Sequence, residues 1–158
     1  MPKNPKQKQK LLYIMKFFME KTDDDYGVTV ADIIDYLEEY GITAERKSIY
    51  SDIECLRDFG FDIVKTKVGK ISLFSLVSRD FSLEEIKLLI DAVQSSKFIT
   101  LKKSRELIHK IERLTSENQA KELHRQVIVA NRVKNSNENI YRNIDNINRA
   151  INNKKKIG

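Results

Sequence analysis

The chain has 158 residues, of which 41% are apolar and 33% are charged, with two prolines and five glycines. This composition is sufficient for a buried core and favours helices over a β-sandwich. No apolar run approaches the ~20 residues that span a bilayer, and the lysine-rich start is not followed by a signal-peptide pattern. We therefore expect a cytoplasmic protein that has no membrane partner.

The sequence contains few cysteine and histidine residues. Cys55 is the only cysteine, so we expect it to be a buried structural residue, and His109 and His124 are too few for a His/Cys metal site. The sequence has no glycine-rich phosphate loop, no nucleophile motif and no pair of histidines near a carboxylate cluster. We therefore expect that the protein binds no metal or other cofactor and is not an enzyme.

Charge is unevenly distributed along the chain. The net charge is +6, but residues 1–80 hold 13 Lys and Arg against 14 Asp and Glu, whereas residues 81–158 hold 16 against 9. The first half therefore carries a net −1 and the second a net +7. If the first half binds DNA, its cations must gather on one face, with the acidic stretches 23–25 and 32–39 turned away.

Three helices are predicted in the first 60 residues. The first begins near Gln7 and ends before the 23–27 loop, and its helical spacing predicts burial of Leu11, Leu12, Met15, Phe18 and Met19. Thr29 is a predicted N-cap, with Asp32 three residues later, for a second helix that ends at Gly41. Its predicted buried stripe is Val30, Ile33, Ile34 and Leu37.

The third helix is predicted over 45–59. It starts after Thr43 and stops at Gly60, and Ile49, Ile53 and Leu56 form its buried face. After Gly60 the period changes from 3.6 to 2, with Phe61, Ile63, Ile71 and Leu73 alternating around a turn at 67–70, which predicts a β-hairpin. Three helices followed by a hairpin is the element order of a winged helix-turn-helix. A generic α+β domain without a nucleic-acid function is the alternative.

The second half is predicted to be helical. Ser82 to Glu85 is a capping box that opens one helix, and Thr100 caps another. Residues 125–130 are rich in β-branched side chains and predict a short strand. Asn137 caps a final helix in which Ile140, Ile144, Ile147 and Ile151 form a seam. This seam is expected either to pair with its copy in a dimer or to pack on the helices at 83–114 within one chain.

The third helix has the polar side that a DNA-reading helix needs, since donors to base edges and phosphates crowd its first two turns. These residues are Arg46, Lys47, Ser48, Tyr50 and Ser51. Cations at a helix N-terminus oppose the helix dipole unless an anion is bound there, so their position favours a phosphate partner over a merely solvated turn. The alternative for Tyr50 is a half-buried position beside the second helix.

The hairpin turn adds three cations, Lys65, Lys67 and Lys70, which suit contact with the DNA backbone or minor groove. Lysines at hairpin tips also protect sheet edges and improve solubility, which is the alternative reason for their presence. Because they accompany a candidate recognition helix, we favour DNA contact.

Several stretches together resemble bacterial transcriptional regulators of the WYL-domain family. RKSIYSDIECLRDFGFDI at 46–63 resembles their recognition helix and the entry to their wing, and SRDFSLEEIKLLIDAVQSSKFI at 78–99 resembles their helical connector. Residues 125–133 and 139–151 continue the similarity, so it covers nearly the whole chain. The resemblance implies a dimeric, sequence-specific DNA-binding protein in which Arg46, Lys47, Ser48, Tyr50 and Ser51 face the groove.

The chain departs from that family in two places. Ser51 stands where similar proteins often have Arg, which removes one expected phosphate contact. The sequence also ends at 154–158, where relatives continue into a β-rich WYL effector domain. We therefore expect a fragment of a longer regulator, with a naturally short regulator as the alternative, and any effector ligand is expected to bind the missing C-terminal domain.

These observations predict a mainly α protein with a small β-hairpin. Residues 1–80 are predicted to form a winged helix-turn-helix DNA-binding domain, and residues 81–158 a helical connector and dimerisation region. The predicted function is sequence-specific transcriptional regulation, with double-stranded DNA and a second copy of the chain as partners. The alternative function is a protein–protein interaction module on a winged-helix scaffold, which the net −1 of residues 1–80 supports.

Overall fold

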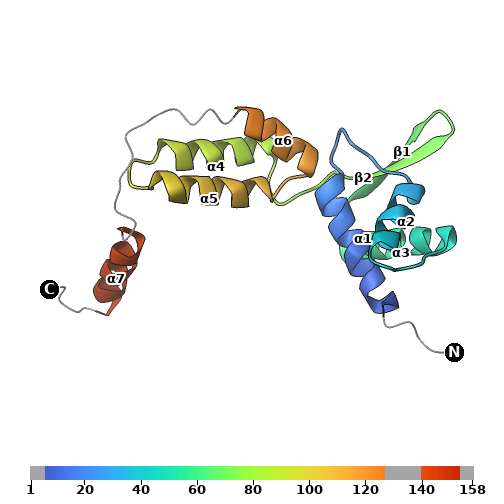
Figure 1. Cartoon of the computed structure of the whole chain (residues 1–158), viewed down its shortest axis with the longest axis horizontal. Helices are drawn as coiled ribbons and strands as arrows, with labels where there is room; N and C mark the ends of the chain where they lie inside the picture. Colours follow the sequence, from blue (N-terminus) through green and yellow to red (C-terminus); the bar gives the residue numbers. More distant parts are fainter. Residues whose placement is uncertain (1–5, 127–139, 154–158) are drawn as a thin grey trace.

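The chain folds into an N-terminal group of three helices and a hairpin, followed by a helical half. The computed structural model describes residues 6–126 and 140–153 (Figure 1). Its elements are α1 (Gln7–Lys21), α2 (Val30–Glu39), α3 (Arg46–Phe59), β1 (Ile63–Val68), β2 (Ile71–Leu76), α4 (Leu83–Ser95), α5 (Leu101–Glu112), α6 (Glu117–Gln126) and α7 (Ile140–Asn152). The predicted class, mainly helical with a small antiparallel hairpin, is confirmed at this level.

Local capping signals set the boundaries of the first helices. The backbone N–H of Asp32 donates to Thr29 Oγ1 at 3.2 Å, and the backbone N–H of Thr29 donates to Asp32 Oδ2 at 2.7 Å, which completes a capping box. Gly60 follows α3 with a φ of 113°, a left-handed conformation that costs glycine little. The predicted starts of α2 and α3 and the stop of α3 are therefore confirmed to within a residue.

The larger apolar core lies between α1, α2, α3 and the hairpin. Its most buried members include Ile14 and Phe18 of α1, Ile33 of α2 and Ile53 of α3. The predicted buried face of α1 is partly wrong. Leu12 is 59% exposed and Met19 is 44% exposed, because the helix turns its Ile14, Phe17 and Phe18 side inward instead.

The hairpin packs one face against this core. Ile63 lies opposite Leu76 and Lys65 lies opposite Phe74, so these residues share a face, and its apolar members are buried. Ile71 lies on the other face and is exposed. A two-residue turn contains Gly69 at a φ of 61°, as tight hairpins require.

The segment before α2 is tied to the same sheet. Val28 and Phe74 exchange two backbone hydrogen bonds, of 2.9 and 2.7 Å. This bridge adds a short third backbone segment to the edge of the sheet, beside β2. It fixes the loop between α1 and α2 against the hairpin.

The second half has its own small core, built from Ile86, Ile90, Ile108 and Leu123. The predicted caps are confirmed: Ser82 closes a capping box with Glu85, and Thr100 Oγ1 accepts from the backbone of Lys103. No helix in the ranges 6–126 and 140–153 has both the length and the apolar character needed to cross a bilayer.

The helix α6 was not predicted. Residues 125 and 126, expected to begin a strand over 125–130, instead end this helix, and the remainder of that segment lies outside the described residues. The helix starts because Ser116 Oγ accepts from the backbone N–H of Gln119 at 3.1 Å, and it packs because Leu123 enters the small core. The predicted cap Asn137 also lies outside the described residues.

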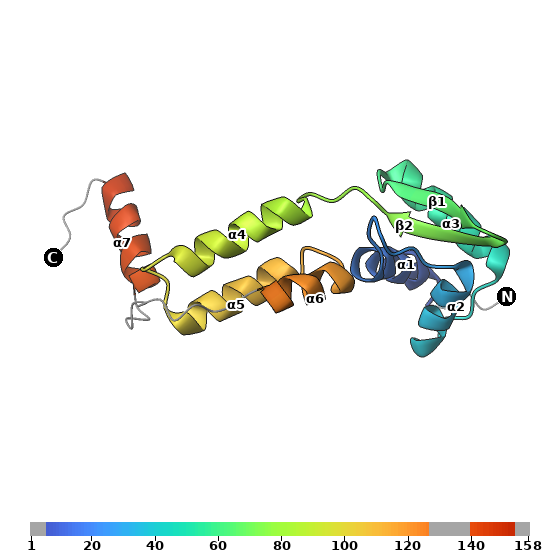
Figure 2. The ribbon, with the colours of Figure 1, turned by 90° about the horizontal axis from the view of Figure 1, so that it is seen from above.

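The end of α1 lies beside α6, where the two halves of the chain meet (Figure 2). Buried polar groups join the halves there. The carboxylate of Asp23, 2% exposed, accepts hydrogen bonds from Ser116 Oγ and from the backbone N–H groups of Asp25 and Tyr26. Arg79 Nη2 donates to the carbonyls of Met19 and Thr22 at 2.8 and 2.6 Å. Burial lowers the pKa of Arg79, while the charges of Asp23 and Asp24 oppose that effect.

The isoleucine seam of α7 is confirmed as one helical face, but it is not covered. Ile144, Ile147 and Ile151 are exposed, and Figure 1 shows α7 separated from α4 and α5. The alternative that this seam packs on the helices at 83–114 within one chain is therefore wrong for the described residues.

Replacement of Ser116 tests the joint between the halves. Ser116→Ala removes a donor to a buried carboxylate and the cap of α6, and we expect a loss of about 1–3 kcal/mol of unfolding free energy. Urea denaturation measures it. Ser78→Ala, at an exposed serine, is the control and should leave stability unchanged; equal stability of both variants would contradict a structural role for Ser116.

Candidate nucleic-acid interface

The helix α3 divides its residues sharply between core and solvent. Ile49, Ile53 and Leu56 are buried, whereas Lys47 and Ser51 each stand two residues from Ile49, about half a turn around the helix, and are exposed. Lys47 and Ser51 lie four residues apart and therefore share the exposed side. Arg46 is also exposed. Three of the five predicted recognition residues thus face solvent.

The N-terminus of α3 is left open. The side chain of its N-cap, Glu45, makes no capping hydrogen bond, and no acidic residue stands in the first turn. The helices α2, α4 and α5, in contrast, have side-chain caps. Uncapped N–H groups beside Arg46 and Lys47 favour an anion such as a phosphate oxygen.

Ser48 was predicted to face solvent, and this prediction is wrong. It is half-buried, and Lys10 Nζ of α1 donates a hydrogen bond to its hydroxyl. Lys10 is itself only 7% exposed and forms an ion pair of 2.7 Å with Asp52, one turn further along α3. The position of Ser48 is explained by this anchor, which sets the rotation of α3 against α1.

Tyr50 is half-buried, but against the hairpin and not beside α2. Its ring lies 5.9 Å from that of Phe74 in an edge-to-face arrangement. Lys65 Nζ lies 5.9 Å from the centre of the Tyr50 ring and 5.7 Å from that of Phe74. These contacts bring the first cation of the hairpin next to α3.

The cations of the hairpin continue this surface. Lys65 and Lys67 lie on the hairpin face that packs against the core, opposite Phe74 and Ser72, and Lys70 follows Gly69 in the turn. All three lysines are exposed. Lys65 alone of the three contacts Tyr50. We call Arg46, Lys47, Tyr50 and Ser51 of α3, together with these three lysines of the hairpin, the basic surface.

The basic surface ends halfway along α3. Glu54 and Asp58 continue the outward side of the helix and are exposed, and Glu54 pairs with Arg57 at 2.6 Å. Cys55 is exposed on the same side, so the prediction that it is buried is wrong. It stands two residues after Ile53, which directs it away from the core. Only the N-terminal half of α3 is suited to approach a polyanion.

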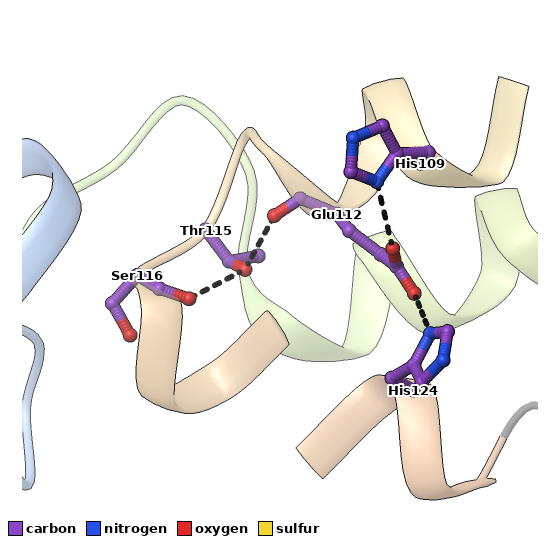
Figure 3. Close-up of polar contacts among 5 residues, drawn as sticks. All are labelled: His109, Glu112, Thr115, Ser116 and His124. Carbon is purple, nitrogen blue, oxygen red and sulfur yellow. Dashed lines mark hydrogen bonds and ion pairs between the residues drawn. The ribbon is translucent and has the colours of Figure 1, made fainter. Parts of the chain in front are cut away.

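The two histidines meet a single carboxylate, an arrangement that was not predicted. Glu112, at the end of α5, is buried, and its Oε1 lies 3.2 Å from His124 Nδ1 while its Oε2 lies 3.7 Å from His109 Nδ1 (Figure 3). Thr115 Oγ1 donates to the carbonyl of Glu112 at 2.9 Å. This cluster ties α5 to α6. Within the described part of the chain, no group of three His, Cys, Asp or Glu side chains has the arrangement to hold a metal ion.

Some of these positions have no signal in the sequence. Lys10 lies 38 residues from Ser48, and nothing in the spacing along α1 distinguishes it from Lys16. The contact between Tyr50 and Lys65 likewise depends on how the hairpin folds back on α3.

Comparison with protein-family models, with curated proteins and with solved structures found no match to this chain.

Replacement of Lys10 tests the anchor that orients α3. Lys10→Met leaves the poorly exposed Asp52 without its cation, and we expect the unfolding free energy to fall by about 1–3 kcal/mol. The control, Lys16→Met on the same helix, removes an exposed lysine 3.9 Å from Glu20 and should change stability little. Thermal denaturation of both variants measures the difference. A Lys10 variant as stable as the control would contradict the role of Lys10 in fixing α3 against α1.

Proposed function

We propose that this chain is a sequence-specific DNA-binding transcriptional regulator, and that residues 1–80 are a winged helix-turn-helix. The observation that carries the proposal is the basic surface, in which exposed cations follow an N-cap without a side-chain hydrogen bond and Lys65 joins the hairpin to α3 at Tyr50. In this mode, α3 enters the major groove with its first turns, and the hairpin lies along the neighbouring backbone or minor groove.

The element order supports this proposal. Three helices are followed by a two-stranded hairpin, and Val28 between α1 and α2 pairs with β2, as expected of a winged helix-turn-helix. Arg46 and Lys47 suit guanine edges or phosphates, and Ser51 suits either. Tyr50 and Lys65 contact each other, so they act as one unit at the border of helix and wing.

The assignment to WYL-domain regulators remains a prediction from the resemblance of 46–63 and 78–99. In that proposal α4, α5 and α6 are the connector behind the wing.

We also propose a homodimer through α7. Its exposed isoleucines recur at coiled-coil spacing, and the pair Asp145 and Arg149, 3.1 Å apart, lies off the seam. The positions that flank the seam, among them Asn143 and Asn148, are uncharged, so two identical helices do not repel each other. A dimer also suits a regulator that binds two half-sites.

Substitution of the first-turn cations tests DNA binding. Arg46→Ala with Lys47→Ala should weaken duplex binding by about tenfold or more, since each base or phosphate contact is worth about 1–3 kcal/mol. The melting temperature should not fall, because both side chains are exposed and oppose the helix dipole. Fluorescence anisotropy with duplexes selected from a random pool measures the affinity.

The matched control for this experiment is Arg105→Ala with Lys110→Ala, which removes the same charge from the exposed side of α5. This control should bind DNA nearly as tightly as the unchanged chain. Equal loss in both double variants would reduce the effect to net charge and would exclude α3 as the recognition helix.

Substitution of two isoleucines in the seam tests whether α7 forms the dimer interface. Ile144→Ala with Ile147→Ala removes apolar surface from the proposed interface and should convert a dimer to a monomer in sedimentation velocity. Asn146→Ala, on the opposite side of α7, is the control and should remain dimeric. An intact dimer after the double substitution would place the interface elsewhere.

A further inference from the structure

A second charged feature lies on α1 and α2, away from the basic surface. A groove of about 430 Å³ runs between these helices and reaches the first residue of α6. Five carboxylates line it, those of Glu20, Asp32, Asp35, Glu39 and Glu117, against the single cation of Lys21. We call it the acidic groove. Four of its five carboxylates belong to residues 1–80, which hold 14 Asp and Glu in all.

The carboxylates of the acidic groove differ in how they are used. Asp32 serves the capping box of α2, and Glu117 accepts a hydrogen bond of 2.6 Å from Lys21 Nζ. Glu20 has a distant and exposed pair with Lys16. Asp35 and Glu39 have no cationic partner among the described residues. The groove therefore keeps negative charge that its own chain does not neutralise.

The acidic groove also contains an unsatisfied buried hydroxyl. Tyr36 is 8% exposed, and its hydroxyl has no hydrogen-bond partner within residues 6–126 and 140–153. Burial, the neighbouring Tyr40 hydroxyl and the charges of Glu20 and Glu39 raise the pKa of Tyr36, so the hydroxyl is protonated at neutral pH. These three neighbours also line the groove, which places the hydroxyl at its wall.

A cation satisfies these groups together. An ammonium or guanidinium group between Glu20 and Glu39 donates charge-assisted hydrogen bonds to both carboxylates and one to the Tyr36 oxygen. The aromatic rings of Phe17, Tyr36 and Tyr40 lie in series, with centroids 4.6 and 5.1 Å apart and planes tilted by 45° and 58°, and offer their edges and faces to the stem of a long side chain.

The lining favours a protein partner over a small molecule. Small-molecule sites are mostly apolar with a few polar groups, whereas carboxylates dominate here. The acidic side chains at 32, 35 and 39 follow one side of α2 over two turns, about 10 Å, which matches cations spaced along a peptide. Charge of one sign over such a length guides and selects an oppositely charged protein.

We propose that the acidic groove binds a segment of a partner protein that carries lysine or arginine side chains. One of these cations lies between Glu20 and Glu39 against Tyr36, and others lie along Asp35 and Asp32. The groove residues come from α1, α2 and the start of α6, so α3 and the hairpin remain available to DNA. The assignment does not depend on the proposed DNA binding.

The test measures binding of fluorescein-labelled octalysine and octaarginine to the full chain by anisotropy. Both peptides should bind at low salt, and Glu39→Gln should weaken binding about two- to fivefold, as expected for one partly screened charge pair. Glu38→Gln is the matched control, since Glu38 is exposed on α2 but does not line the groove. The control should bind the peptides like the unchanged chain.

Tyr36→Phe separates a binding role from a structural one. Because the hydroxyl has no hydrogen-bond partner in the described part of the chain, its removal should leave the melting temperature unchanged or raise it, while it weakens peptide binding at least twofold. A variant that melts lower and binds unchanged would overturn the role of the hydroxyl.

Three further results would overturn the proposal. These are failure of both peptides to bind at low salt, an equal effect of Glu38→Gln and Glu39→Gln, and binding of spermidine as tight as that of octalysine, which would make the groove a polyamine site. Duplex DNA binding by the Glu39 and Tyr36 variants should match that of the unchanged chain. Loss of DNA affinity in them would contradict the independence of the two surfaces.

Discussion

The rotation of α3 about its own axis is the constraint on which the rest of the account depends. Its three buried apolar residues fix one side against the core, and the ion pair between Lys10 and Asp52 fixes a second side against α1. Tyr50, packed on Phe74, fixes a third. The side that remains carries cations and a hydroxyl in its first half and carboxylates in its second. A partner with negative charge therefore meets α3 at its N-terminal end.

The same helix that anchors α3 also joins the two halves of the chain. Near its start α1 supplies Lys10 to α3, and just past its end Asp23 accepts a hydrogen bond from Ser116 at the beginning of α6. The acidic groove lies along α1 between these two points. A partner in the groove therefore contacts the first residue of α6, where the two halves meet, without covering the basic surface.

The sequence predicted the features whose causes are local. The caps at Thr29, Ser82 and Thr100 and the left-handed Gly60 depend on residues within one turn, and all of them occur where expected. The buried face of α3 also followed from its spacing. The position of Ser48 and the existence of α6 did not, because contacts from distant parts of the chain decide them. Cys55 was expected to be buried because of its residue type, although its spacing from Ile53 directs it outward. Lys10 donates a hydrogen bond to Ser48, and Leu123 stabilises α6 by packing into a core built from α4 and α5.

The candidate surfaces show the same division. Arg46, Lys47 and the hairpin lysines could be named from the sequence, since exposed cations in a first turn or a hairpin tip need no distant partner. The contact of Lys65 with Tyr50, the meeting of both histidines at Glu112 and the unpartnered Tyr36 hydroxyl all depend on how separate elements pack. Charge totals alone concealed the acidic groove and the basic surface, because in residues 1–80 the two nearly cancel.

The salt dependence of duplex DNA affinity tests the central claim most directly. If the basic surface neutralises phosphates, the logarithm of the association constant should fall linearly with the logarithm of salt concentration. The expected slope is about −2 or steeper, since each phosphate contact contributes about −0.9. An affinity that does not change between about 50 and 200 mM salt, or no binding to any duplex at the lower concentration, would contradict the account.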